Sequence, residues 1–151
     1  MAYGSVADIV FAMKITIDRL APPSIETMEQ IAQSQLKSLP DEFSRFVQDL
    51  IVRVDDFPDD ETMEELDLEN EFELLGLYRG VALNDKSLNN TATDVDMVFL
   101  YRRPILDYWC ETEEDLGHLV RHVLIHEIGH HFGLSDDDME KIENAPERSI
   151  N

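Results

Sequence analysis

The sequence predicts one globular domain that contains both helices and strands. A chain of 151 residues suits a single domain. Its apolar fraction of 43% is sufficient for a buried core. Segments with apolar residues at helical spacing alternate with short runs rich in β-branched residues. We therefore expect helices and strands to share one core.

The beginning of the chain has no clear periodicity. Residues 1–23 predict an N-terminal tail or loosely attached segment, and residues 24–151 the domain itself. Ser24 is suited to cap a helix that Pro40 ends. A second helix can then start with Pro40 or Asp41 in its first turn.

Three segments have the composition of extended chain. The β-branched run "LIVRVDDF" predicts a buried strand at 50–57. Two glycines around an apolar core predict an extended segment that ends in a turn at 74–83. The run "DMVFLYR" predicts a strand at 96–102.

The segments between these elements are polar. Acidic residues dominate 55–73, which lack the glycine and the alternating ligands of a calcium-binding loop, so we expect a solvated loop there. Residues 84–94 predict a polar loop, and residues 104–110 a turn or short helix.

All five histidines lie at or just before the segment 121–140. Residues 111–133 predict one helix with Thr112 as N-cap and Gly133 as the left-handed residue that stops it. At about 100° per residue, the apolar side chains form one arc with His126 and His130 at its edge. The arc comprises Leu116, Leu119, Val120, Val123, Leu124 and Ile128.

His126 and His130 have the spacing of metal ligands. Two imidazoles at i and i+4 project from adjacent turns and can meet one zinc ion. A catalytic zinc needs a third protein ligand and an open position for water. Asp136 can supply that ligand after the chain bends at Gly133, with Asp137 and Asp138 as close rivals. Glu127 can take the proton from the water.

The segment "HEIGHHFGLSD" at 126–136 resembles the zincin signature H-E-x-x-H-x-x-G-x-x-D. Further stretches are similar to the small bacterial zincin-like metallopeptidase domain, or minimal zincin, and the resemblance covers about residues 24–142. They are "LPDEF" at 39–43, "VDDFP" at 54–58, "ELLGLYRGVAL" at 73–83 and "VFLYRRPIL" at 98–106.

The resemblance implies a compact α+β fold with a small mixed sheet packed on helices, including the metal-site helix. It implies zinc held by His126, His130 and Asp136, with Glu127 as general base. It also implies that the strand at 96–102 is the edge strand that pairs with an extended peptide. Tyr78 or Tyr101 could donate to a tetrahedral oxyanion, although a core or rim position suits either ring.

The remaining histidines have simpler interpretations. We expect His122 to support the site or lie on the surface, His131 to be a partly buried packing residue, and His118 to be solvated. An ordinary amphipathic helix with surface histidines is the plain alternative to a metal site.

The composition limits partners and location. A net charge of −21 opposes binding to nucleic acid and anionic membranes, and favours peptide or protein partners, including basic ones. No stretch approaches the ~20 apolar residues of a membrane span. The single cysteine excludes an internal disulfide, and the first residues lack the basic start of a signal peptide, so we expect a monomer in the cytoplasm.

Three functions fit this pattern. The first is a zinc-dependent metallopeptidase, a hydrolase that cleaves peptide bonds. The second is a metal-dependent endoribonuclease with the spacing H-x-x-x-H-x-x-x-x-x-H, which Glu127 and the negative charge disfavour. The third is a non-catalytic zinc or peptide-binding module, which the lack of a fourth ligand disfavours.

Overall fold

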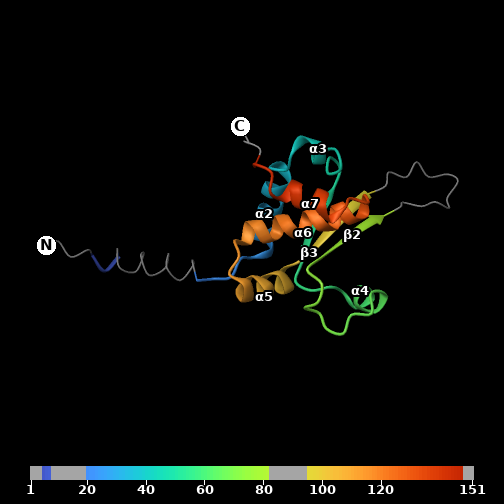
Figure 1. The fold of residues 1–151 in the computed structure, drawn as a ribbon. Helices are drawn as coiled ribbons and strands as arrows, with labels where there is room; N and C mark the ends of the chain where they lie inside the picture. The colour runs from blue at the N-terminus through green and yellow to red at the C-terminus, as the bar shows by residue number, and fades with distance from the viewer. Residues whose placement is uncertain (1–4, 8–19, 82–94, 148–151) are drawn as a thin grey trace.

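The computed structural model describes residues 5–7, 20–81 and 95–147 (Figure 1). The expectations for most of the 1–23 tail and for the polar loop at 84–94 lie outside these residues. Along the chain the elements are α2 (Ile25–Lys37), α3 (Asp41–Ser44), β1 (Ile51–Asp55), α4 (Asp60–Glu65), β2 (Gly76–Val81), β3 (Val95–Tyr101), α5 (Arg102–Thr112), α6 (Leu116–His131) and α7 (Asp136–Glu143).

The strands form one mixed sheet in the order β1-β3-β2. β1 runs parallel to β3 with Val54 opposite Leu100, and β2 runs antiparallel to β3 with Tyr78 opposite Val98. The domain is therefore α+β with a small mixed sheet, as the resemblance implies. The expectation that 96–102 is the edge strand is wrong, because β3 pairs on both sides.

Helices α2 and α6 cover one face of this sheet (Figure 1). α2 packs on β1, α6 packs on β2 and β3, and the two helices contact each other. Side chains alternate between the faces of a strand, so Val54, Val98 and Leu100 point together into the core beneath these helices. The core also contains Met28, Ala32, Leu119, Val120, Leu124, Ile125, Ile128 and Met139.

Local sequence signals explain where two of the helices begin. Ser24 caps α2 as expected, since its side chain accepts a hydrogen bond from the backbone N–H of Thr27. The acidic stretch 55–73 is not only a loop, because it contains α4. There Asp59 accepts from the backbone N–H of Thr62, a capping signal that the acidic composition obscured.

The expected burial of the first strand is also wrong. Of β1 only Val54 is buried, and Ile51 is 47% exposed. β1 pairs only with β3 among the described strands, and α2 covers one of its faces. A strand at the edge of a sheet with one face covered cannot be buried along its whole length.

The helix expected at 111–133 starts later, at Leu116, and is separated from a preceding helix, α5. α5 ends at Thr112, and Glu113 adopts a left-handed conformation with φ 56°. α6 then begins with Asp115 as its N-cap, whose carboxylate accepts from the backbone N–H of His118 at 3.0 Å. Thr112 is therefore not the N-cap of the histidine helix. Of the described helices, none has the length and apolar character to cross a membrane.

Candidate metal centre

Helix α6 is anchored by its apolar side and presents its histidines on the other. Leu124, Ile125 and Ile128 are buried in the core. His126 and His130 lie on adjacent turns, with ring centroids 5.7 Å apart and ring planes at 78°. The His126 side chain is 27% exposed and that of His130 is 60% exposed. The pair is accessible to a metal ion and to water.

The turn after α6 brings a carboxylate to this pair. Gly133 has φ +73°, a conformation that favours glycine, and it ends the helix as the sequence predicts. α7 then starts at Asp136, whose Oδ1 lies 4.0 Å from Nε2 of His130. Asp138 is engaged elsewhere: its carboxylate accepts from the hydroxyl of Ser135, and this hydrogen bond lowers its pKa.

Packing between α6 and α7 fixes the position of that carboxylate. Gly129 faces Met139, which is fully buried, and a Cβ on Gly129 would lie 2.4 Å from the Met139 sulfur. Only a residue without a side chain allows α7 to approach α6 so closely. The close contact therefore sets how α7 directs its acidic side chains toward the histidines.

Glu127 lies on the side of α6 that faces β2. Burial raises the pKa of its carboxyl, while a backbone hydrogen bond from Tyr78 and the charge of His130 act in the opposite direction. A carboxylate with a raised pKa, near a metal-ligand pair, suits a general base. Gly76 makes this contact possible, since a Cβ there would lie 2.6 Å from a methyl of Val123 and 3.4 Å from Cγ of Glu127.

The edge of β2 that points away from β3 faces the side chain of Glu127. The backbone N–H of Tyr101 donates to the carbonyl of Leu75, so this is a hydrogen-bonded pair of the antiparallel ladder. Such pairs alternate with pairs whose polar groups point away from the partner strand. Tyr78, three residues after Leu75, is one of the latter, and its backbone points away from β3 toward Glu127.

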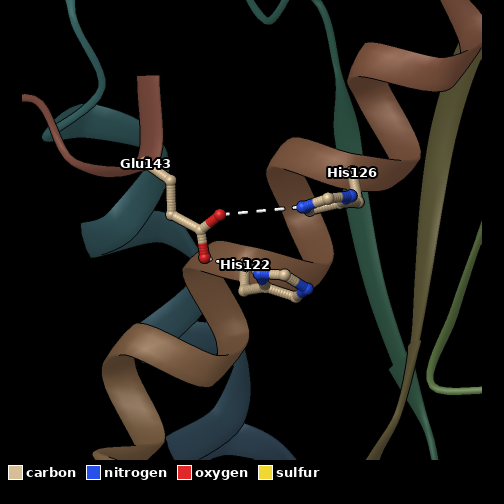
Figure 2. Close-up of side chains that lie close together, drawn as sticks. All are labelled: His122, His126 and Glu143. Atoms are coloured by element: carbon tan, nitrogen blue, oxygen red, sulfur yellow. Dashed lines mark hydrogen bonds and ion pairs between the residues drawn. The ribbon is translucent and has the colours of Figure 1, made fainter. Parts of the chain in front are cut away.

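A second set of side chains gathers one turn earlier on α6 (Figure 2). Glu143 of α7 lies between His122 and His126, with Oε1 2.5 Å from Nδ1 of His122 and Oε2 3.6 Å from Nε2 of His126. The two imidazole centroids are 4.0 Å apart. Burial and the neighbouring His122 lower the pKa of His126, so its neutral, metal-binding form is favoured.

Residues 47–145 match the family described as zincin-like metallopeptidase, a range that includes the sheet, α6 and α7. The chain belongs to this family. A comparison with curated proteins found no match.

Membership of this family implies a metal, usually zinc. Two imidazoles and a carboxylate are the ligand types of catalytic zinc sites. His130 lies near both His126 and Asp136, and all three side chains are accessible to solvent. Among the described residues, however, the ligand atoms that lie within 4.8 Å of one another belong to His122, His126 and Glu143. The residue types of His126, His130 and Asp136 therefore suit zinc, and their assignment as its ligands stays a prediction.

The rings of the two tyrosines considered as oxyanion donors are packed against other side chains or buried. Tyr101 is 2% exposed, and burial raises its pKa to about 12. Tyr78 stacks on His131 with ring centroids 3.8 Å apart, and burial together with Asp96 raises its pKa. Both are packing residues in this arrangement. His131 packs on Tyr78 as expected but is exposed rather than partly buried, and His118 is exposed as expected.

Sequence reasoning did not find Glu143. The spacing of His122 and His126 is visible, but Glu143 lies 17 residues after His126 on another helix. Its approach depends on the angle between α6 and α7, which Gly129 and Met139 set. A signal was present in the repeat of acidic residues along α7, "DDDMEKIE", since residues one or two turns apart share a helix face.

Proposed function

We propose that the protein is a zinc-dependent peptidase that hydrolyses peptide bonds. His126, His130 and Asp136 would hold the ion. Bound zinc would supply Lewis-acid chemistry that makes a water molecule acidic near neutral pH. The observation that carries the proposal is the position of Glu127, partly buried against β2 and adjacent in the chain to the first histidine.

Glu127 would act as the general base. Its carboxylate takes a proton from the attacking water and then delivers it to the departing amine of the cleaved peptide bond. The raised pKa supports both roles, since it brings proton affinity closer to working pH. The hydrogen bond from the Tyr78 backbone would hold the carboxylate in place between the two steps.

The substrate would be an extended peptide on the edge of β2 that pairs with no other strand among the described residues. Gly76, Tyr78 and Gly80 alternate along that strand and direct backbone groups away from β3. Because the Tyr78 backbone engages Glu127, the added strand would pair with the groups of Gly76 and Gly80. An added strand obtains its affinity from such groups. The substrate strand would thus lie beside β2 rather than beside 96–102, and next to Glu127.

The substrates are expected to be neutral or basic. α7 carries five acidic residues and one lysine beside the histidines, and the whole chain has a net charge of −21. A polyanion such as RNA would be repelled, which disfavours the endoribonuclease alternative. We further infer that the protein acts as a monomer in the cytoplasm, where its single cysteine stays reduced.

The decisive experiment compares the zinc-loaded protein with Glu127→Gln on a mixture of peptides, with and without chelator. The amide is nearly isosteric but cannot accept the proton, so zinc should stay bound while hydrolysis falls by about 10²–10⁴-fold. Equal hydrolysis by the variant would remove Glu127 from the mechanism. Absence of hydrolysis in both proteins, with zinc bound, would favour a binding module.

A further inference from the structure

Three side chains, of which only His126 belongs to the proposed peptidase set, form a compact group of metal-binding type. His122, His126 and Glu143 each offer a ligand atom, and these atoms all lie within 4.8 Å of one another. Each oxygen of Glu143 faces a different imidazole nitrogen (Figure 2). We propose that these residues form a second metal position, one helical turn before the peptidase position and sharing His126 with it.

The distances suit a transition-metal ion. Ligands about 2.0–2.1 Å from a tetrahedral zinc lie about 3.3 Å from one another. Nε2 of His126 and Oε2 of Glu143 are 3.6 Å apart, close to that value. The contact between His122 and Glu143, at 2.5 Å, has to widen to admit an ion. In comparison, His130 and Asp136 are 4.0 Å apart, and Asp136 is 92% exposed.

Glu143 is held in position by a buried cation. Arg121 is 3% exposed and donates to the hydroxyl of Ser38 at 2.9 Å and to the carbonyl of Ile142 at 3.2 Å. The second bond ties the end of α7 to α6 immediately before Glu143. Preorganised ligands lose little freedom when an ion binds. The side chains of His126 and Glu143 are each 27% exposed and that of His122 is 49% exposed, so water and ions can reach the group.

The ligand types define the class of ion. Two imidazoles favour zinc, copper, nickel or cobalt, whereas magnesium and calcium prefer a set of oxygen ligands. Three protein ligands leave one tetrahedral position for water, so the ion should exchange rather than be permanently enclosed.

The shared histidine makes the two positions alternatives. A neutral imidazole has one nitrogen with a free lone pair. The nitrogen of His126 that faces Glu143 is Nε2. An ion held by His122 and Glu143 through this atom removes His126 from the peptidase set. The second position would thus compete with the first for the same ligand.

The test removes the peptidase position and asks whether metal still binds. The full-length chain carrying His130→Ala and Asp136→Asn would be freed of metal and titrated with Co²⁺, followed by its visible absorption, and with Zn²⁺ against a chromophoric chelator. Into this background either Glu143→Gln or His122→Asn is introduced. Glu140→Gln, on an exposed position of the same helix, is the matched control.

The background protein should bind one ion per chain, and magnesium should not compete. Adding Glu143→Gln or His122→Asn should weaken binding by more than the ~10–100-fold typical of residues that only support ligands. Glu140→Gln should leave binding unchanged. The proposal is overturned if the background protein binds no Co²⁺, or if Glu143→Gln weakens binding no more than Glu140→Gln.

Two further readouts keep the result interpretable. Far-ultraviolet circular dichroism and thermal unfolding identify a variant that has lost its fold. If either Glu143→Gln or His122→Asn unfolds the protein, the other variant still tests the proposal. Long-range proton–nitrogen NMR of the histidines should show metal-dependent shifts at Nδ1 of His122 and Nε2 of His126; unchanged shifts contradict the proposal. Because no hydrolysis is measured, failure here is distinct from failure of the peptidase assignment.

Discussion

At the scale of the single residue, Glu127 combines a polar group with an apolar setting. Its carboxylate lies between α6 and β2, and burial raises its pKa above the ordinary 4.5. Perturbed carboxyls of this type gather at functional sites, and they lower the stability of the fold that holds them. The same group thus connects the proposed chemistry with the energetics of folding.

We predict that Glu127→Gln stabilises the metal-free protein at neutral pH. A raised folded-state pKa means that the folded chain binds the proton more tightly than the unfolded chain. Stability is therefore greatest at low pH and is lost as pH rises through the folded-state pKa. Glutamine is uncharged and avoids this loss. Thermal unfolding of both metal-free proteins over a pH series should show a higher Tm for the variant at neutral pH and convergence in acid; a lower Tm at neutral pH contradicts the argument.

Asp136 and Asp138 should differ sharply as zinc ligands. Asp136 lies near His130, while Asp138 is occupied by Ser135 at the start of α7. Asp136→Ala should weaken zinc by more than the ~10–100-fold of a supporting residue, and Asp136→His should restore binding, because imidazole is a good zinc ligand. Asp138→Ala is the control, expected to affect helix stability instead. A chelator competition in which Asp138→Ala or Asp137→Ala causes the larger loss would show that the assigned ligand is wrong.

At the scale of the element, close contacts of glycines with neighbouring elements set the site. Gly129 admits α7 to α6, and Gly76 admits α6 to β2. The sequence pattern does not predict either contact. A glycine within a strand or helix pattern indicates only that another backbone approaches closely or that a bulge is present. The structure shows which element packs against each glycine.

We predict that Gly76→Ala lowers the free energy of unfolding by about 1–3 kcal/mol, the usual cost of overpacking. The added methyl would lie 2.6 Å from Cγ1 of Val123 and 3.2 Å from the backbone oxygen of Phe99. Val123→Ala removes the first clash, so the double variant should be more stable than the sum of the single effects. Gly80→Ala, whose nearest neighbour is 3.3 Å away on the side chain of His131, should cost less. Denaturant unfolding measures all four; equal losses at 76 and 80 would contradict this.

The sequence predicted features that depend on neighbouring residues and missed those that depend on arrangement. The histidine spacing, the Ser24 cap and the Gly133 stop are local, and the helix and glycine conformations follow from them. The break before α6 was missed because Thr112 and Asp115 both have capping side chains, and only the left-handed Glu113 decides between them. The central position of β3 depends on the sheet topology, and the approach of Glu143 to His122 and His126 depends on helix packing. Hydrophobic periodicity predicts neither, because it reports only local structure.

At the scale of the whole molecule, charge is the dominant feature. The chain carries 33 acidic and 12 basic residues, and α7 concentrates acids beside the histidines. The family match covers residues 47–145, yet α2, which begins at Ile25, packs on both α6 and β1. The elements that support the site, and the charges that surround it, therefore extend beyond the segment that matches the family.

If the protein is a peptidase, its field should select among peptides in a salt-dependent way. A strongly negative surface concentrates cationic substrates and can raise association rates by about 10–10³-fold. The Debye length falls from about 30 Å at 0.01 M salt to about 8 Å at 0.15 M, so much of that advantage should vanish over this range. We predict that kcat/KM for a lysine-rich peptide falls at least several-fold between these concentrations, whereas a matched neutral peptide changes little and an acidic one improves. Steady-state assays of the zinc-loaded protein on the three peptides measure this, with zinc content checked at each salt concentration. A uniform salt response would instead locate the effect in the protein's stability or metal affinity, since those act equally on every substrate.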